Sequence, residues 1–387
     1  MQDSTLSQVR KPGFFKTSVL IFNLVAAALL LLSQVSPGFS PSRIWFMELV
    51  AMSYPFFLVL NIFFVFYWLL KFHRFLFISA AIIIMGYDKI SQLYSPTMFR
   101  VDVMPPPGSI KIMSYNVRLF DLYNWSGNQK TRSKIFSYLN KEQPEVLCIQ
   151  EYYSSEHPKN DYNNNDTIPK ILKNCNSHIE YGVTLRKTDH WGLATFSKFP
   201  IVGKGKIIFE EGSTNFGMFT DVIYQDDTIR IYNVHLQSNH FKEEDMQIID
   251  DPENSSKGQI FRGSKRILAR LKHGAIKRSY QVDELKAHMQ SSPYPYIVCG
   301  DFNDPPYTYA YQTLRKDLKD AFVDKGKGFG ITFSGTIMPF RIDYILHQES
   351  FMTHRFQVTQ TQLSDHYPIT AWLTLQGKKK PKMSEIK

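Results

Sequence analysis

The sequence has few cysteines for its length, three in 387 residues, and this excludes a secreted scaffold held together by disulfides. Cys148 and Cys299 each lie inside a short apolar run that predicts a buried strand, where a small apolar side chain suffices. Cys175 falls in a polar insertion. We therefore assign no redox or metal chemistry to the cysteines.

Residues 1–94 lack a small-x-small cleavage site after their first apolar block, so this block is not a cleaved signal peptide. Three apolar blocks follow one another, at 18–35, 45–70 and 75–94, and each approaches or exceeds the ~20 residues that a helix needs to cross a bilayer. They also lack the polar stripe of a soluble helix, which disfavours a buried helical hairpin. We expect a transmembrane anchor of about three helices, kinked at Pro55.

Cations flank these blocks unevenly. Arg10, Lys11 and Lys16 precede the first block, and Lys71 and Arg74 lie between the second and the third. The positive-inside rule makes both places cytoplasmic. The chain is then an integral, multi-pass membrane protein whose later part is expected outside the cytoplasm, in the periplasm or at the cell surface.

The net charge of +10 is also unevenly spread. Residues 110–387 hold 37 Lys or Arg against 31 Asp or Glu, and the tail 377–387 supplies +4 of this excess. The remainder is nearly balanced, which neither requires nor excludes a nucleic-acid partner. We expect a proline-rich linker at 95–109, a globular domain at 110–376 and a solvated basic tail at 377–387.

The most informative motif is GDFND at 300–304. It follows the apolar run 296–299, and Gly300 permits a sharp exit, so Asp301 and Asn303 are expected at the end of a strand. Their carboxylate and amide oxygens are hard ligands suited to Mg²⁺ or Mn²⁺. Together with His366, whose imidazole can bind a phosphoryl oxygen or move a proton, they are the groups that a metal-dependent phosphoester hydrolase needs.

Three more strand-like runs carry polar residues. Alternation in 111–118 places Asn116 near the end of a strand. The apolar run 146–149 leads to Glu151 at its end, which is either a metal ligand or a helix cap. In 229–236, His235 shares a face with polar residues, although a structural histidine is the alternative.

Asp343 lies within the otherwise apolar run 341–346. An isolated buried carboxylate costs several kcal/mol, so Asp343 must be paired or solvated. His366 is a suitable partner, because an aspartate that accepts from one imidazole nitrogen fixes the tautomer and leaves the other nitrogen for substrate.

Seven segments occur in the order found in one superfamily: SYNVR at 114–118, QE at 150–151, GLATFSKFPI at 192–201, YNVHLQS at 232–238, GDFND at 300–304, RIDYIL at 341–346 and SDHYPI at 364–369. From about 110 to 375 the chain resembles the endonuclease/exonuclease/phosphatase superfamily, which includes deoxyribonuclease I, AP endonucleases, deadenylases, inositol polyphosphate 5-phosphatases and neutral sphingomyelinases. The resemblance implies an α/β (α+β) fold, a four-layer α/β/β/α sandwich with two mainly antiparallel sheets, preceded here by about three transmembrane helices.

The resemblance also implies roles for individual residues. Five match positions at the Mg²⁺ (or Mn²⁺) centre: Asn116, Glu151, Asp301, Asn303 and Asp365. Asp301 also matches the acid that orients or deprotonates the attacking water, and Asn303 the amide that holds a phosphate oxygen. His366 matches the imidazole at the scissile phosphate, with Asp343 as its orienting acid.

Two positions refine the resemblance. His235 matches a histidine of the deoxyribonuclease I and sphingomyelinase branches that protonates the leaving oxygen, and AP endonucleases generally lack it. Leu193 stands where many relatives carry Asn, which puts one substrate or metal contact in doubt.

The acid-free run 261–278 is either a phosphate or membrane-surface patch or a solvated helix face.

Three functions follow from these observations. The leading expectation is a membrane-anchored, Mg²⁺-dependent phosphodiesterase of nuclease type, with the lipid bilayer and nucleic acid as partners. The alternative is hydrolysis of phospholipid, sphingomyelin or a small phosphoester. A non-enzymatic binding module built on an inactive hydrolase would have lost a central ligand, and none is missing here.

Overall fold

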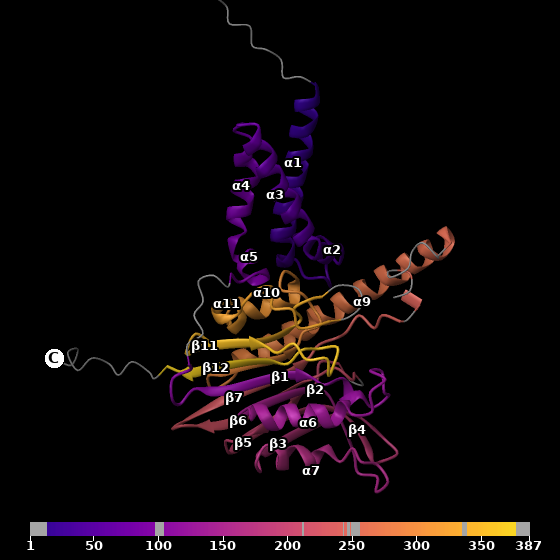
Figure 1. Cartoon of the computed structure of the whole chain (residues 1–387), viewed down its shortest axis with the longest axis vertical. Helices are drawn as coiled ribbons and strands as arrows, with labels where there is room; N and C mark the ends of the chain where they lie inside the picture. Colours follow the sequence, from indigo (N-terminus) through magenta and orange to yellow (C-terminus); the bar gives the residue numbers. More distant parts are fainter. Residues whose placement is uncertain are drawn as a thin grey trace, which may run out of the picture.

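The computed structural model describes residues 14–96, 104–210, 213–242, 244–245, 248, 256–334 and 339–376. An amino-terminal bundle of helices stands on a larger sandwich of two sheets (Figure 1). The predicted basic tail 377–387 and residues 97–103 of the predicted linker lie outside the described residues.

The bundle contains five α-helices among the described residues: α1 Phe14–Val35, α2 Phe46–Met52, α3 Tyr54–Leu70, α4 Leu76–Met85 and α5 Tyr87–Leu93. Together with the short η1 (Ser36–Gly38), α1 is long and apolar enough to cross a membrane. The pairs α2–α3 and α4–α5 qualify only if each counts as one span, because they bend by 48° and 67°. The first bend immediately precedes Pro55, where a kink was predicted.

The interior of the bundle holds a group of hydrogen-bonded polar side chains among buried apolar ones. Asn23 of α1 donates from Nδ2 to Ser79 Oγ of α4 (2.6 Å), and it accepts from Trp68 Nε1 of α3 (2.9 Å). Ser79 Oγ in turn donates to Asn61 Oδ1 (2.7 Å). These buried bonds join three helices, while large apolar side chains such as Phe63, 59% exposed, cover the outer surface.

The first sheet has six strands in the order β11-β12-β1-β2-β4-β3. Their bounds are Phe351–Val358, Ile369–Leu375, Ile110–Asn116, Val146–Ser155, Asp189–Ser197 and Asn176–Leu185, in that order. Only the central pair, β1 and β2, is parallel. The buried face of helix α6 (Thr131–Glu142) and that of α7 (Asn164–Ile171) pack on one side of this sheet.

The second sheet repeats this plan in the order β5-β6-β7-β8-β10-β9. Its strands are Ile201–Ile207, Gly217–Tyr224, Asp227–His235, Tyr296–Asp301, Asp343–His347 and Lys319–Asp320, in that order. Again only the central pair, β7 and β8, is parallel. Helices α9 (Lys257–Gln290) and α10 (Tyr309–Arg315) pack on the outer side, and the short α11 (Ala321–Lys325) follows β9.

The two sheets bury their inner faces against each other. This central core is largely aliphatic, and it includes Ile112 and Cys148 from the first sheet and Ile231, Cys299 and Ile345 from the second. Separate clusters fill the outer helix–sheet layers. The predicted four-layer α/β sandwich is therefore confirmed, and two of the cysteines serve as small core side chains as predicted.

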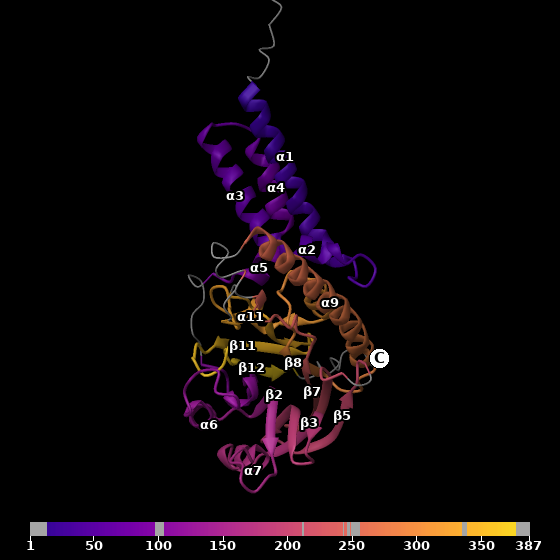
Figure 2. The same ribbon diagram turned by 90° about the vertical axis from the view of Figure 1, so that its right-hand side faces the viewer.

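The bundle is docked on the sandwich through its base. Figures 1 and 2 show α2 and α5 between the upright helices and the layer that contains α10 and α11. Tyr54 of α3 packs against Tyr307 with ring centroids 5.9 Å apart, and Arg315 of α10 lies 3.2 Å from Asp88 of α5. The bundle and the sandwich thus share a polar and apolar interface.

Candidate active site

Strand register brings three predicted residues side by side. In the parallel pair β7–β8, His235 lies opposite Asp301, and in the antiparallel pair β8–β10, Asp343 lies opposite the same Asp301. All three therefore occupy adjacent positions across three neighbouring strands. His366 reaches this row from the loop before β12.

Gly300 has a different role from the one predicted. The strand β8 continues through it to Asp301, so Gly300 is not the exit from the strand. Its φ is +151°, and a Cβ at this position would lie 2.0 Å from the carbonyl oxygen of Val234. The glycine allows β7 and β8 to approach closely, and this places His235 beside Asp301.

His366 lies between two carboxylates. Its Nδ1 is 2.9 Å from Asp343 Oδ2, and its Nε2 is 3.6 Å from Asp301 Oδ2. All three residues are at most 5% exposed. The structure thus places Asp343 where an orienting acid for His366 is expected, with the other ring nitrogen directed toward Asp301.

Charge in this cluster follows from the same geometry. Burial raises the pKa of Asp343 to about 6, although the His366 charge opposes the shift. Burial by itself would lower the pKa of His366, but the carboxylates of Asp343 and Asp301 raise it to about 10. At neutral pH the pair is therefore an imidazolium–carboxylate ion pair, and His366 presents positive charge.

Asn116 connects the two sheets at the site. Its Nδ2 donates to Asp301 Oδ2 at 3.0 Å and to Glu151 Oε1 at 3.3 Å. Glu151 is not at the end of a strand as predicted, because β2 continues to Ser155. It instead lies at a β-bulge with φ +50°, and this irregular backbone sets it apart from the regular ladder.

Asn303 and Asp365 have other partners. Asn303, with φ +54°, donates its backbone N–H to Asp301 Oδ1 (2.8 Å) and its amide to the Leu236 carbonyl (3.0 Å). Asp365 Oδ2 lies 3.3 Å from Arg118 Nε. Both border the cluster, but the described hydrogen bonds and ion pairs do not join either one to Glu151.

The residues at the site suit a divalent cation. Asn116 lies between two carboxylates, those of Glu151 and Asp301, and no Lys or Arg of the described chain forms an ion pair with either. Such oxygen-rich, negatively charged surroundings match the ligand preference of Mg²⁺. The buried group of Asp301, Asp343 and His366 also brings three possible ligand atoms together, but Asp343 Oδ2 and His366 Nδ1 already bind each other.

Sequence reasoning missed several residues that support the site. Thr332 Oγ1 accepts from the backbone N–H of Asp343 at 3.1 Å, and the Phe333 ring packs on His366 with centroids 5.0 Å apart. No recognisable motif surrounds either residue. Arg118 belongs to the SYNVR segment and could have been singled out, but only the fold shows that it reaches Asp365.

Burial and ion pairing decide two further expectations, those for Leu193 and for the run 261–278. Leu193 is 1% exposed and packs with Phe216 and Met218, so it contributes no polar contact to the site. In the run 261–278, Arg278 is buried against Asp304, and Arg270 pairs with Asp245. The run is therefore neither wholly a free basic patch nor a fully solvated face, because acids from other segments neutralise part of it.

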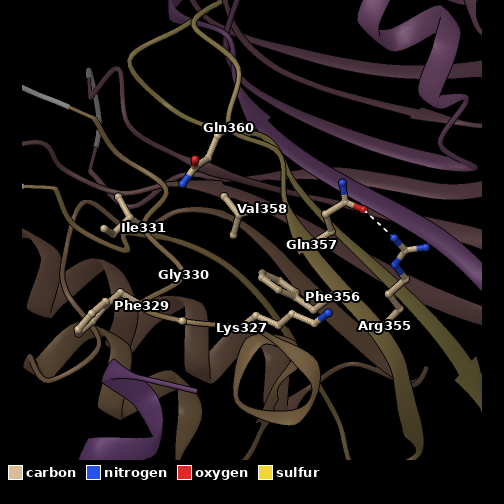
Figure 3. A pocket seen from close by; sticks show the side chains of 10 residues that line it. Lys327, Phe329, Gly330, Ile331, Arg355, Phe356, Gln357, Val358 and Gln360 are labelled. Carbon is tan, nitrogen blue, oxygen red and sulfur yellow. Dashed lines mark hydrogen bonds between the residues drawn. The ribbon is translucent and has the colours of Figure 1, made fainter. Parts of the chain in front are cut away.

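A hollow of about 460 Å³ is lined by none of the residues of this cluster, and Figure 3 shows the side chains around it. None of its lining residues bears a carboxylate or an imidazole, the groups on which the proposed chemistry depends: Lys327, Gly328, Phe329, Gly330, Ile331, Arg355, Phe356, Gln357, Val358 and Gln360. The candidate active site is therefore the cluster of side chains around Asp301.

Similar structures have been solved. They include a mannosyl-6-phosphatase of Bacteroides thetaiotaomicron, 17% identical over 69% of this chain and 100% of that chain, with a TM-score of 0.48. A humanised D. rerio TDP2 is 15% identical over 69% and 99%, with a TM-score of 0.48. The human Nocturnin catalytic domain with bound sulfate is 16% identical over 73% and 99%, with a TM-score of 0.47.

Two families match separate parts of the chain, and these parts correspond to the helical bundle and to the sandwich. Residues 16–93 match a domain of unknown function (DUF8431). No curated protein matches the chain. Residues 113–366, which are 254 of the 387, match the Endonuclease/Exonuclease/phosphatase family. This chain therefore belongs to the endonuclease/exonuclease/phosphatase family.

Proposed function

We propose that this chain is a membrane-anchored, divalent-metal-dependent phosphodiester hydrolase that acts on nucleic acid. Members of its family are phosphoester hydrolases. The observation that carries the proposal is the convergence on Asp301 of Asn116, His235 and His366, with Asp343 behind His366. These are the residue types that in-line attack of water on a phosphoester requires.

Asp301, His366 and His235 each have a separate role in the proposed reaction. Asp301 orients the attacking water and takes its proton, and its own orientation is fixed by Asn303 N–H and Asn116 Nδ2. The His366 imidazolium, held by Asp343, stabilises negative charge on the phosphoryl oxygens. His235, with Nε2 3.7 Å from Asp301 Oδ2, protonates the leaving oxygen.

Glu151 and Asn116 would hold the cation, with Asp301, Asn303 and Asp365 around it. A bound Mg²⁺ or Mn²⁺ supplies Lewis-acid stabilisation of the phosphoryl oxygens. The bulge at Glu151 and the left-handed backbone at Asn303 keep these two side chains beside the site. Each is a strained position whose cost of order 1–3 kcal/mol is expected at a functional site.

An exposed aromatic pair supports nucleic acid as the substrate. Tyr123 and Trp125 are 61% and 47% exposed and lie with ring centroids 5.0 Å apart. The guanidinium of Arg118 lies 4.7 Å from the centroid of the Trp125 ring and also pairs with Asp365. Stacking of a base on such a ring is worth about 1–3 kcal/mol and suits an unpaired strand.

The second candidate is hydrolysis of a phospholipid head group. The outer surface of the bundle favours it, because exposed side chains such as Phe22, Phe56 and Phe77 would place the sandwich beside a bilayer. In both candidate functions residues 1–94 are the anchor, 95–109 the linker and 110–376 the catalytic domain.

Orientation in the membrane is part of the proposal. Lys71 and Arg74 lie between α3 and α4, at the end of the bundle away from the sandwich (Figure 1). Under the positive-inside rule this end is cytoplasmic and the sandwich is extracytoplasmic. In intact cells and with Cys175 replaced by Ser, an impermeant maleimide should label Phe39→Cys and not Phe72→Cys, and the reverse pattern would refute this orientation.

One panel of substrates tests the function. The full chain, in detergent and with Mg²⁺, is assayed on plasmid DNA, single-stranded DNA, RNA and sphingomyelin, with Asp301→Ala as the inactive control. We expect cleavage of nucleic acid and a loss of at least ~10²-fold in the folded variant. Activity on lipid alone would make the second candidate correct, and a fully active Asp301→Ala protein would disprove the site.

A further inference from the structure

The helical bundle contacts the two segments that border the candidate active site. Helix α2 packs against the stretch that follows GDFND, and α5 contacts Arg341, two residues before Asp343. Figures 1 and 2 agree in placing these two helices at the base of the bundle, against the sandwich. The contacts therefore lie close in sequence to the residues that the proposed chemistry uses.

The first contact is made by Glu48 of α2, which is only 3% exposed. Its Oε2 accepts a hydrogen bond from the backbone N–H of Tyr309 at 3.3 Å, at the start of α10. Its carboxyl group is also buried beside that of Asp304, the last residue of GDFND. A carboxyl group from the bundle is thus buried directly behind the site loop.

Asp304 in turn forms an ion pair with Arg278 of α9. Arg278 Nε and Nη2 lie 2.8 and 2.9 Å from the two carboxylate oxygens of Asp304, and both side chains are 1% exposed. Arg278 Nη1 donates to the Gln237 carbonyl (2.9 Å) and to Asn239 Oδ1 (3.1 Å). One guanidinium therefore ties the segment after His235 to the loop that follows Asp301.

The second contact is made by α5. The carbonyl oxygen of Gln92, a residue 1% exposed, accepts from Arg341 Nη2 at 2.8 Å. Arg341 Nη1 also lies 2.7 Å from Asp320 Oδ2. Arg341 is buried, and Ile342 and Asp343 follow it in the chain. The bundle therefore also contacts the segment that carries Asp343, the partner of His366.

We infer that the bundle positions the active site, and that Glu48 is the positioning residue through which it holds the Asp304–Arg278 pair. The inference rests on the proposed phosphoester hydrolase site and adds a role for the amino-terminal helices beyond attachment. Small displacements of catalytic groups lower rates strongly, because reacting atoms must be aligned within fractions of an ångström. Loss of Glu48 would remove the contact between the bundle and Asp304, and it would leave the Tyr309 N–H without its buried acceptor.

The test compares Glu48→Ala, Glu48→Gln and the matched surface control Glu349→Ala in the full chain. Glutamine keeps a donor for Asp304 and an acceptor for the Tyr309 N–H. With bis(p-nitrophenyl) phosphate and Mg²⁺, we expect kcat to fall at least ~10-fold in Glu48→Ala with KM within about twofold. Glu48→Gln should keep kcat within about threefold of wild type, and Glu349→Ala should be unchanged.

Amide hydrogen exchange provides a readout that does not depend on activity. In Glu48→Ala, segments 236–240 and 302–309 should exchange faster, whereas β12 should keep its protection. Wild-type kcat with unchanged exchange would overturn the inference, as would equal loss of protection in β12, which would indicate general destabilisation. If the wild type hydrolyses no phosphoester, the proposed function fails, and the exchange comparison still decides whether the bundle holds these segments.

Discussion

The Nδ1 atom of His366 lies 2.9 Å from Asp343 Oδ2, although the two residues are 23 positions apart in the chain. Thr332 Oγ1 binds the backbone of Asp343, and Phe333 packs on the imidazole, so both partners are held from the same loop. The pair is buried and charged, which is stable only because each group neutralises the other.

The first prediction concerns this pair. Asp343→Asn keeps the shape of the side chain but removes the charge that fixes the His366 imidazolium. We expect kcat on bis(p-nitrophenyl) phosphate to fall at least ~10²-fold in a folded protein. The control is Asp226→Asn, in an exposed turn, which should retain full activity. A variant at Asp343 with kcat within threefold of wild type would show that the pair is merely structural.

The second prediction concerns the cation. Treatment of the full chain with EDTA should abolish hydrolysis, and Mg²⁺ or Mn²⁺ should restore it. Glu151→Gln removes a carboxylate ligand, so the Mg²⁺ concentration for half-maximal activity should rise about 10–100-fold. Glu156→Gln, at an exposed acid that directly follows β2, serves as the control. An unchanged Mg²⁺ dependence in Glu151→Gln would exclude Glu151 as a ligand.

The third prediction concerns the leaving group. If His235 protonates the departing oxygen, His235→Ala should lose about 10²–10⁴-fold in kcat on a diester with a nucleoside leaving group. It should lose much less on bis(p-nitrophenyl) phosphate, because p-nitrophenolate departs without a proton. The exposed His157 supplies a matched alanine control. Equal losses on the two substrates would argue that His235 acts by position rather than as an acid.

Local patterns were enough to predict the strands that carry Asn116, Glu151, His235, Asp301 and Asp343. The apolar run 296–299 and the run 341–346 form neighbouring strands, and both deliver the acids that the motifs indicated. Short apolar runs are local signals, so a sequence can reveal them without knowledge of the fold. The order of the seven motifs predicted the family and its sandwich fold, which no single apolar run could indicate.

Register, bulges and docking could not be predicted in this way. The positive φ of Glu151 has no glycine or turn signal, because it results from a bulge against a distant strand. Similarly, Glu48 was counted as part of an apolar block, and only the fold shows that it is buried against Asp304. Glu48 and Asp304 are more than 200 positions apart in the chain, and local periodicity carries no information about contacts between distant segments.

The last prediction concerns stability and pH. His178 of β3 bridges the sheets: its Nδ1 lies 2.8 Å from Thr220 Oγ1 of β6, and its Nε2 lies 3.1 Å from Glu180 Oε1. Burial lowers the pKa of His178 below its usual 6.5, although Glu180 opposes the shift. Above pH 6.5 both folded and unfolded states hold a neutral ring. Below it the unfolded state takes up a proton that the folded state resists, so the free energy of unfolding falls with decreasing pH.

His178→Gln should therefore lose less stability than wild type between pH 7.5 and pH 5. Urea unfolding of both proteins at several pH values in this range measures the difference. Other histidines with shifted pKa values, such as His288 and His366, are present in both proteins and cancel in the comparison. Parallel pH profiles for the two proteins would mean that His178 binds its proton equally well in the folded and unfolded states, contrary to its burial between the sheets.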